Sequence, residues 1–292
     1  MFSTQSLRKL ILPLFLDQIL LVLVSIVSTM LLSYAGEAAV SGVSLVEMVN
    51  VLLINILIAL STGGAVVVAQ MIGSQNHFLA NKSAGQIVFI TLLVSVTFTL
   101  VVLFFHPLSS LSYPFLALYN TSAALFRAQG NSRIPMLASM FMNGLNILGF
   151  YLAIFVFQAG ITGVAIATLG SRLLSSIVLV ILNFNQNNIV YLDFHSIFSF
   201  DLNLIKKILS IAIPNGIENG ITQFGRILLA SIIALFGTAQ ITANGITNSL
   251  GMFAISYATA VNFAIVTVVG QCIGAKEFDQ AEYYIRKLLR QA

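Results

Sequence analysis

Long apolar runs dominate this chain and restrict what it can fold into. Runs of about 18 or more mainly apolar residues recur from one end of the sequence to the other, and each is long enough to cross a bilayer as an α-helix. Only 8% of the residues are charged, whereas soluble domains carry about 25%. We therefore predict an all-α polytopic membrane protein.

Polar breaks divide these runs into eight predicted spans. Arg8 and Lys9 precede a first run that is too long for the apolar core of a signal peptide, so we expect it to stay in the protein. The spans are Leu10–Tyr34, Leu45–Gln70, Gln86–Phe105, Leu111–Phe126, Pro135–Phe157, Gly163–Phe184, Ile208–Phe236 and Ser249–Gln271.

The positive charges lie on one side of this arrangement. When eight spans alternate in direction, eleven of the thirteen Lys and Arg residues fall on the side of the N-terminus, and the four connections on the opposite side hold none. The other two cations, Arg172 and Arg226, fall within spans. Because cytoplasmic loops are enriched in Lys and Arg, we predict a multi-pass cell-membrane protein with a cytoplasmic N-terminus, in a cell inner membrane.

The sequence also repeats itself at an offset of 201 positions. VVVAQMIGSQ, near the end of the second span, returns as TVVGQCIGAK at the end of the eighth. The shared Gln-x-x-Gly suits a helix end where a span leaves the bilayer. Other polar and special positions pair as well: Pro13 with Pro214, Asp17 with Glu218, and Gly36 with Gly237. Spans 7 and 8 thus repeat spans 1 and 2 in the same direction, which is one architecture of secondary transporters.

A period of six spans implies twelve in a complete molecule and divides this chain into three parts. Residues 1–184 form an N-terminal six-helix lobe that is shortened between helices 3 and 4. Residues 185–207 form a cytoplasmic interlobe connection, for which a surface-lying helix and a plain loop are equally consistent with the sequence. Residues 208–292 begin a C-terminal lobe with helices 7 and 8.

Two acidic residues lie inside predicted spans and are the first candidates for substrate or ion coupling. Asp17 lies in span 1, and Glu218 occupies the equivalent place in span 7. Carboxylates within a bilayer normally face a cavity or a partner. We expect the two acids to face each other across a central cavity, where they bind a lipophilic cation or exchange it for a proton. Pairing with a nearby cation or amide is the structural alternative.

Other polar residues within spans are weaker candidates. Arg226 lies two turns beyond Glu218 on nearly the same helix face, and it is either a counter-ion or a packing partner. Gln223 is a further candidate, although interhelical hydrogen bonding is the favoured explanation for it. We expect Arg172 to be structural.

Four stretches of the sequence identify a family. They are PLFLDQILLVLVSIVSTMLLSYAGEAAVSGVSL, LSYPFLALYNTSAALFRAQGNSRIPM, GITGVAIATLGSR and IPNGIENGITQFGRILL. With both Gln-x-x-Gly segments they cover nearly all of the chain, which resembles the MATE (multidrug and toxic compound extrusion) family of the Gram-positive bacterial type. The resemblance implies two six-helix lobes around a central cavity. It also implies efflux of cationic drugs by antiport, with H⁺ or Na⁺ as the coupling ion and no other cofactor.

The chain departs from the family pattern in its first-lobe ion pocket. Many members use an Asp in span 1, an Asn and an Asp four residues apart in span 5, and a Thr in span 6. The matching positions here are Ser28, Asn146, Phe150 and Thr168. Asn146 and Thr168 remain candidate ion ligands, but both acids are replaced, so the resemblance shifts the expected coupling to Asp17 and Glu218.

Two further departures concern length. FFHPLSSLSYPF joins spans 3 and 4 more directly than in family members, and the sequence stops after about the eighth helix. We therefore expect an incomplete copy of the transporter. The alternatives are a flippase for a lipid-linked intermediate from the same superfamily and a non-transporting gene remnant.

Enzymatic and nucleic-acid functions find no support in the sequence. It contains no nucleophile elbow, phosphate loop, dinucleotide fingerprint or clustered metal ligands. We expect neither an enzyme nor a metal protein, and the net charge of +4 is too small to favour nucleic acid. The expected partners are small cationic drugs and the lipid bilayer.

Overall fold

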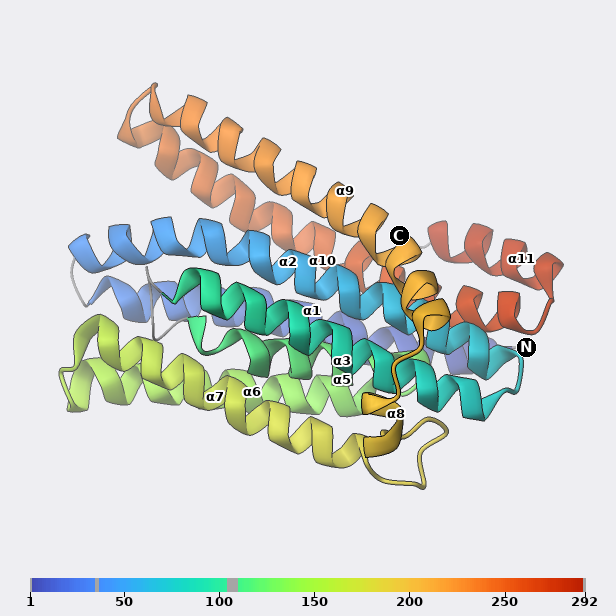
Figure 1. Cartoon of the computed structure of the whole chain (residues 1–292). Helices are drawn as coiled ribbons and strands as arrows, with labels where there is room; N and C mark the ends of the chain where they lie inside the picture. Colours follow the sequence, from blue (N-terminus) through green and yellow to red (C-terminus); the bar gives the residue numbers. More distant parts are fainter. Residues whose placement is uncertain (1, 35–36, 104–109, 291–292) are drawn as a thin grey trace.

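The computed structural model describes residues 2–34, 37–103 and 110–290, and within these ranges the chain is built from helices that run roughly alongside one another (Figure 1). Side chains are described there except at residues 37–49 and scattered positions near 29–33, 161 and 234–249. The helices are α1 (Thr4–Ser33), α2 (Glu37–Gly73), α3 (His77–Val102), α5 (Tyr113–Ala128), α6 (Arg133–Tyr151), α7 (Gly160–Asn183), α8 (Phe194–Phe198), α9 (Leu202–Ala234), α10 (Thr238–Gly274) and α11 (Phe278–Leu289).

Each of the eight predicted spans coincides with a helix over its described residues; the end of the third, at Phe104 and Phe105, lies outside them. The fifth ends in a π-helical turn at Leu152–Val156. Six of them are long and apolar enough to cross a membrane within the described residues. The short α5, with 16 residues, falls below the usual spanning length. The other exception is α9, which is 33 residues long but carries Glu218, Gln223 and Arg226 among its apolar residues.

The sequence repeat is confirmed as a structural repeat. Helices α2 and α10 both contain 37 residues, and their first and last residues are 201 positions apart. The turns that follow them also match: Gln75 and Lys276 have φ values of 59° and 61°. Asn76 N donates to the Met71 carbonyl, and its counterpart Glu277 N donates to the Cys272 carbonyl, both over 3.0 Å. The turn after α10 therefore repeats the backbone geometry of the turn after α2.

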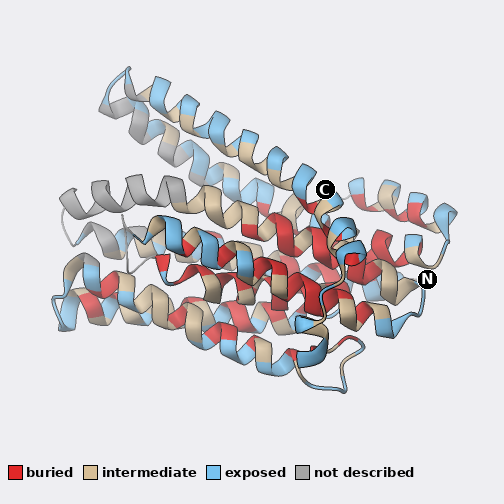
Figure 2. Cartoon of the chain, in the orientation of Figure 1, coloured by how far each residue is buried: buried red, intermediate tan, exposed pale blue. Residues whose placement is uncertain are grey.

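The two parts of the chain, α1–α7 and α9–α11, meet at one end of the bundle, where α1, α6 and α9 begin and α5 ends (Figure 1). We call it the cation-rich end, because these helix ends carry Arg8, Lys9, Arg127 and Arg133. In Figure 1, α9 and α10 lie close to the other helices at this end and diverge from them toward the other end. Buried residues are concentrated where the two parts meet (Figure 2).

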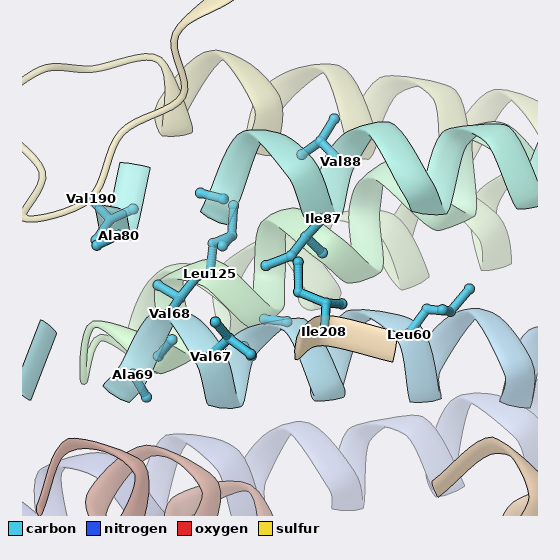
Figure 3. Close-up of a cluster of buried hydrophobic side chains, with 14 of the residues drawn as sticks. Leu60, Val67, Val68, Ala69, Ala80, Ile87, Val88, Leu125, Val190 and Ile208 are labelled. Carbon is cyan, nitrogen blue, oxygen red and sulfur yellow. The ribbon is translucent and has the colours of Figure 1, made fainter. Parts of the chain in front are cut away.

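The largest hydrophobic cluster lies at this junction. It combines side chains of α2, α3 and α5 with Ile208 and Ala212 of α9, and Figure 3 shows Ile208 among Val67, Ile87 and Leu125. Because these side chains come from both lobes, their burial holds the lobes together there.

Up to Asp201 the interlobe connection is a loop with one short helix, α8, and its last residues, 202–207, form the start of α9. Val190 and Leu192 of this loop are buried in the main hydrophobic cluster. Gln86 of α3 donates to the carbonyls of Ser196 and Ser199, over 3.0 and 2.5 Å. Lys82 forms an ion pair with Asp201, at 2.6 Å, just where α9 begins. Of the two alternatives that the sequence left open, the structure favours the loop.

Candidate functional site

Asp17 lies at a junction of three helices in the first lobe. Its side chain projects from α1 and is only 6% exposed. The carboxylate is hydrogen-bonded by the Ser139 hydroxyl of α6 and interacts electrostatically with Arg127 of α5. Tyr119 of α5 also shares the Ser139 hydroxyl. We call these four residues the Asp17 cluster.

The cluster leaves part of its acid unsatisfied. The Oδ1 atom of Asp17 is buried and has no hydrogen-bond partner among the described residues. Such a buried acceptor is costly unless it gains a hydrogen-bond donor, a proton or a cation. An acid in this setting is therefore suited to taking up an ion.

Arg127 connects the Asp17 cluster to the second lobe. Its guanidinium carbon lies 4.5 Å from the centre of the Phe263 ring of α10. The Arg127 carbonyl accepts a hydrogen bond of 2.9 Å from the Thr267 hydroxyl. The next carbonyl, that of Ala128, accepts one of 2.8 Å from the Gln271 amide. The end of α5 is thus bound to α10 through the repeated glutamine and the threonine one turn before it.

Glu218 has a different environment from its counterpart Asp17. It is exposed on α9 and forms no side-chain hydrogen bond or ion pair among the described residues. Since Asp17 is enclosed by α5 and α6, the two acids do not face each other across a cavity as we expected from the sequence. The repeat preserves the position of the acid along the helix but not its burial.

A pocket of about 430 Å³ lies between α1, α9 and α10. Arg226 is its only charged lining residue, and it forms no hydrogen bond or ion pair in the part of the chain that the structure describes. Gln18 and Ser25 of α1 and Thr259 of α10 add polar groups to its wall. Gln223, one turn before Arg226, is half-buried and does not line this pocket.

The family-type ion position in the first lobe is partly filled by apolar side chains. Asn146 Nδ2 donates to the Ser171 hydroxyl over 3.2 Å, and the Thr168 hydroxyl donates to the Val164 carbonyl over 2.9 Å. Phe150 is buried against Val164. An aromatic ring thus packs where the family pattern has an acid, and the Asn146 amide is engaged by a neighbouring hydroxyl.

Arg172 makes a hydrogen bond between two helices, as expected of a structural residue. Its Nη1 atom donates to the Ser112 hydroxyl over 2.7 Å, which ties α7 to the start of α5.

Sequence reasoning missed three members of the site. Because the predicted fourth span ends at Phe126, the sequence predicts Arg127 to be a loop cation on the side of the N-terminus. In the structure α5 continues to Ala128, so Arg127 lies within the helix. Tyr119 and Ser139 were not singled out. Tyr119 and Arg127 are eight residues apart, so they lie on nearly the same face of a helix. This spacing is the sequence feature from which their proximity could have been predicted.

A comparison with family profiles decides where this chain belongs. The MatE profile matches residues 13–111 and again residues 214–290. The chain belongs to the MatE family. The two matches begin 201 positions apart, so the profile recognises the same repeat as the sequence and the structure. The chain is accordingly a multi-pass membrane protein of the MatE family.

Two curated relatives show how much of a MatE protein is covered. The chain is 26% identical to the uncharacterized transporter YisQ of Bacillus subtilis, over 96% of this chain and 67% of the relative. It is 25% identical to the probable multidrug resistance protein NorM of Thermotoga maritima, over 92% of this chain and 63% of NorM. This chain therefore spans about two thirds of the length of the MatE relatives it matches.

Solved structures show the same fold. A MOP superfamily transporter from Pyrococcus furiosus, described with a binding pocket of reverse polarity that suggests a different function, aligns with a TM-score of 0.90 at 20% identity, over 98% of this chain and 68% of its own. A mutant of the Vibrio cholerae MATE transporter VcmN aligns with a TM-score of 0.89 at 18% identity, over 98% of this chain and 69% of its own. The helix arrangement is therefore that of MATE transporters.

Proposed function

We propose that this chain forms part of a multidrug transporter that exports organic cations across the cytoplasmic membrane in exchange for H⁺ or Na⁺, with its cation-rich end in the cytoplasm. The observation that carries the proposal is the Asp17 cluster: a buried carboxylate, with one oxygen unpartnered among the described residues, coupled to a cation that contacts the other lobe. Membership of the MatE family and the similarity to NorM support multidrug export.

The coupling proceeds through Arg127. When Asp17 is ionised, its charge attracts the Arg127 guanidinium. When Asp17 takes up a proton or a Na⁺ ion, that attraction disappears, and Arg127 and its contacts to Phe263 and Thr267 become easier to separate. Uptake of the ion thereby loosens the contact between the lobes at the cation-rich end. An ion that binds Asp17 more tightly in one conformation than in the other shifts the equilibrium toward the first.

Glu218 is the proposed contact for the cationic substrate. It is the acid that lies exposed within α9. A desolvated organic cation is stabilised by a carboxylate within a span, because few other charges there compete for the carboxylate. The two acids thus have different roles: the buried Asp17 binds the coupling ion, and the exposed Glu218 binds the drug.

Efflux measurements in a drug-hypersensitive bacterial host test this function. Cells that express the chain should expel ethidium faster than cells with the empty vector. Asp17→Asn and Glu218→Gln should each reduce the rate at least about tenfold, whereas Glu282→Gln, an exposed acid of α11, should not. Efflux equal to that of the vector, while NorM is active in the same host, would refute export by this chain and favour a non-transporting remnant.

A flippase for a lipid-linked phosphate is the second candidate, and the pocket at Arg226 favours it. A guanidinium that has no ion-pair partner among the described residues, set among Gln, Ser and Thr side chains, suits a phosphate better than an amine. Arg226→Gln separates the two functions. If the variant loses lipid translocation in reconstituted vesicles but keeps ethidium efflux, the pocket is assigned to a lipid. If it keeps lipid translocation but loses ethidium efflux, the multidrug proposal is retained.

A further inference from the structure

A groove between α1 and α6 combines a cationic mouth with an apolar wall. It has a volume of about 400 Å³ and opens at the cation-rich end of the bundle. Three cations line it: Arg8 and Lys9 from the second turn of α1, and Arg133 from the first residue of α6. All three side chains are exposed, and none forms an ion pair among the described residues. No lining residue is acidic.

The apolar wall lies deeper along the same two helices. Leu12 and Leu16 follow Arg8 at intervals of four residues, and Leu137 follows Arg133 by four. Residues four apart share one helix face, so each cation stands directly above apolar side chains. These leucines are 59%, 47% and 58% exposed, which leaves them uncovered within the described chain. The groove is therefore charged at its mouth and apolar over about 12 Å below it.

A second groove runs along the other side of α1. It has a volume of about 450 Å³ and is lined by Phe15 and by Tyr257 of α10. Arg8 and Leu12 line both grooves. The exposed Leu12 thus forms a ridge with an apolar channel on either side and the same arginine at the top of both.

We propose that this pair of grooves is a binding site for an anionic phospholipid such as phosphatidylglycerol. Its phosphate lies among Arg8, Lys9 and Arg133, and its two acyl chains lie on either side of Leu12. The partial positive charges at the starts of α1 and α6 add to the attraction. Basic pockets between helix ends at the membrane surface are suited to such headgroups. The apolar depth distinguishes a lipid from a free phosphate ion, which gains nothing from leucines.

Native mass spectrometry of the purified chain in a mild detergent tests the site. Phosphatidylglycerol should be retained at least about tenfold better than phosphatidylcholine with the same acyl chains, because only the first carries a net negative charge. The triple variant R8Q/K9Q/R133Q should lose this preference. The matched control K206Q/K207Q/R290Q removes three exposed cations that do not line the grooves, and it should keep the preference.

A second variant tests the acyl-chain part without changing any charge. Leu137→Trp fills the α1/α6 groove at an exposed position that tolerates a larger side chain, so it should reduce phosphatidylglycerol retention even if the triple variant fails to fold. Competition by glycerol 3-phosphate equal to that by the lipid would overturn the proposal in favour of a simple anion site. If both triple variants lose the preference for phosphatidylglycerol equally, the binding is general charge attraction and the specific site is refuted. Doubling of the mass in place of lipid adducts would assign the grooves to a second copy of the chain.

Discussion

Gly73 of α2 lies directly against the main-chain carbonyl of Gln271 in α10, and the repeat places Gly274 of α10 against the carbonyl of Gln70 in the same way. A Cβ atom on either glycine would overlap that carbonyl oxygen. The sequence predicted a helix end for this motif, and both helices do end there. The stronger reason for glycine is that the two repeated helices cross at this point. The glycine of each helix leaves room for a backbone carbonyl of the other.

Substituting these glycines should therefore weaken the contact between the lobes. We expect Gly73→Ala and Gly274→Ala each to destabilise the protein by about 1–3 kcal/mol, because the obstacle is backbone and cannot move aside like a flexible side chain. Gly144→Ala in α6 is the control, since nothing lies within 4 Å of the added Cβ atom and alanine favours a helix. Thermal unfolding in detergent measures the effect. Equal stability of all three variants would contradict the crossing.

The helices were predictable from the sequence because a bilayer imposes a long apolar run on every span. Their boundaries were less predictable. Helix α2 begins at Glu37 rather than near Leu45, and α9 begins at Leu202 rather than Ile208, because polar residues extend both helices beyond the apolar segment. Composition measures where a helix is apolar, whereas its ends depend on hydrogen bonds such as those that Asp201 accepts at the start of α9.

The contact between Arg127 and Phe263 gives a second prediction. Phe263→Leu keeps an apolar side chain but removes the aromatic face beneath the guanidinium, so we expect a loss of about 0.5–2 kcal/mol. Phe253→Leu, at a more exposed position of α10 without a described ring contact, is the matched control and should change stability less. Chemical denaturation in detergent measures both. In the proposed mechanism, Phe263→Leu also raises ion leak in the absence of substrate. An unchanged leak would show that the contact between Arg127 and Phe263 has no part in coupling.

The candidate site was less predictable than the fold. Asp17 stood out because an acid inside a span is rare, but its partners come from α5 and α6, more than 100 positions away. Symmetry suggested equivalent roles for Asp17 and Glu218, yet burial depends on neighbouring helices that the repeat does not duplicate within this chain. A polar residue's position in a span is readable from sequence, whereas the face it presents to other helices is a property of packing.

The first-lobe position of Phe150 provides a third prediction. Phe150→Ala removes a ring packed against Val164 and should destabilise the protein by about 3–5 kcal/mol. Tyr151→Ala, at the adjacent exposed residue, is the control and should cost much less. Na⁺ should not alter the stability of the parent chain through this position, since no acid stands there. Sodium-dependent stabilisation that Phe150→Ala abolishes would show that the position still binds the ion.

The ion pair between Lys82 and Asp201 predicts a pH dependence at the interlobe connection. The hydrogen bond from Lys82, together with the amides of Leu204 and Asn203, holds the pKa of Asp201 below its usual range. A carboxyl group whose pKa is lowered by folding stabilises the folded state above its unfolded pKa, and this contribution disappears as the pH falls through the lower folded value. The stabilisation should therefore be complete at neutral pH and fade below about pH 4.

Asp201→Asn isolates the charge, because asparagine still accepts the amide hydrogen bonds at the start of α9. We expect this variant to melt at a lower temperature than the parent at pH 7, and by a smaller difference near pH 3. Asp201→Ala should also lose the cap, so its melting temperature should stay lower at both pH values. Asp193→Asn, at the exposed residue before α8, is the control and should follow the parent. A constant difference between Asp201→Asn and the parent from pH 7 to pH 3 would mean that the ion pair does not set this dependence.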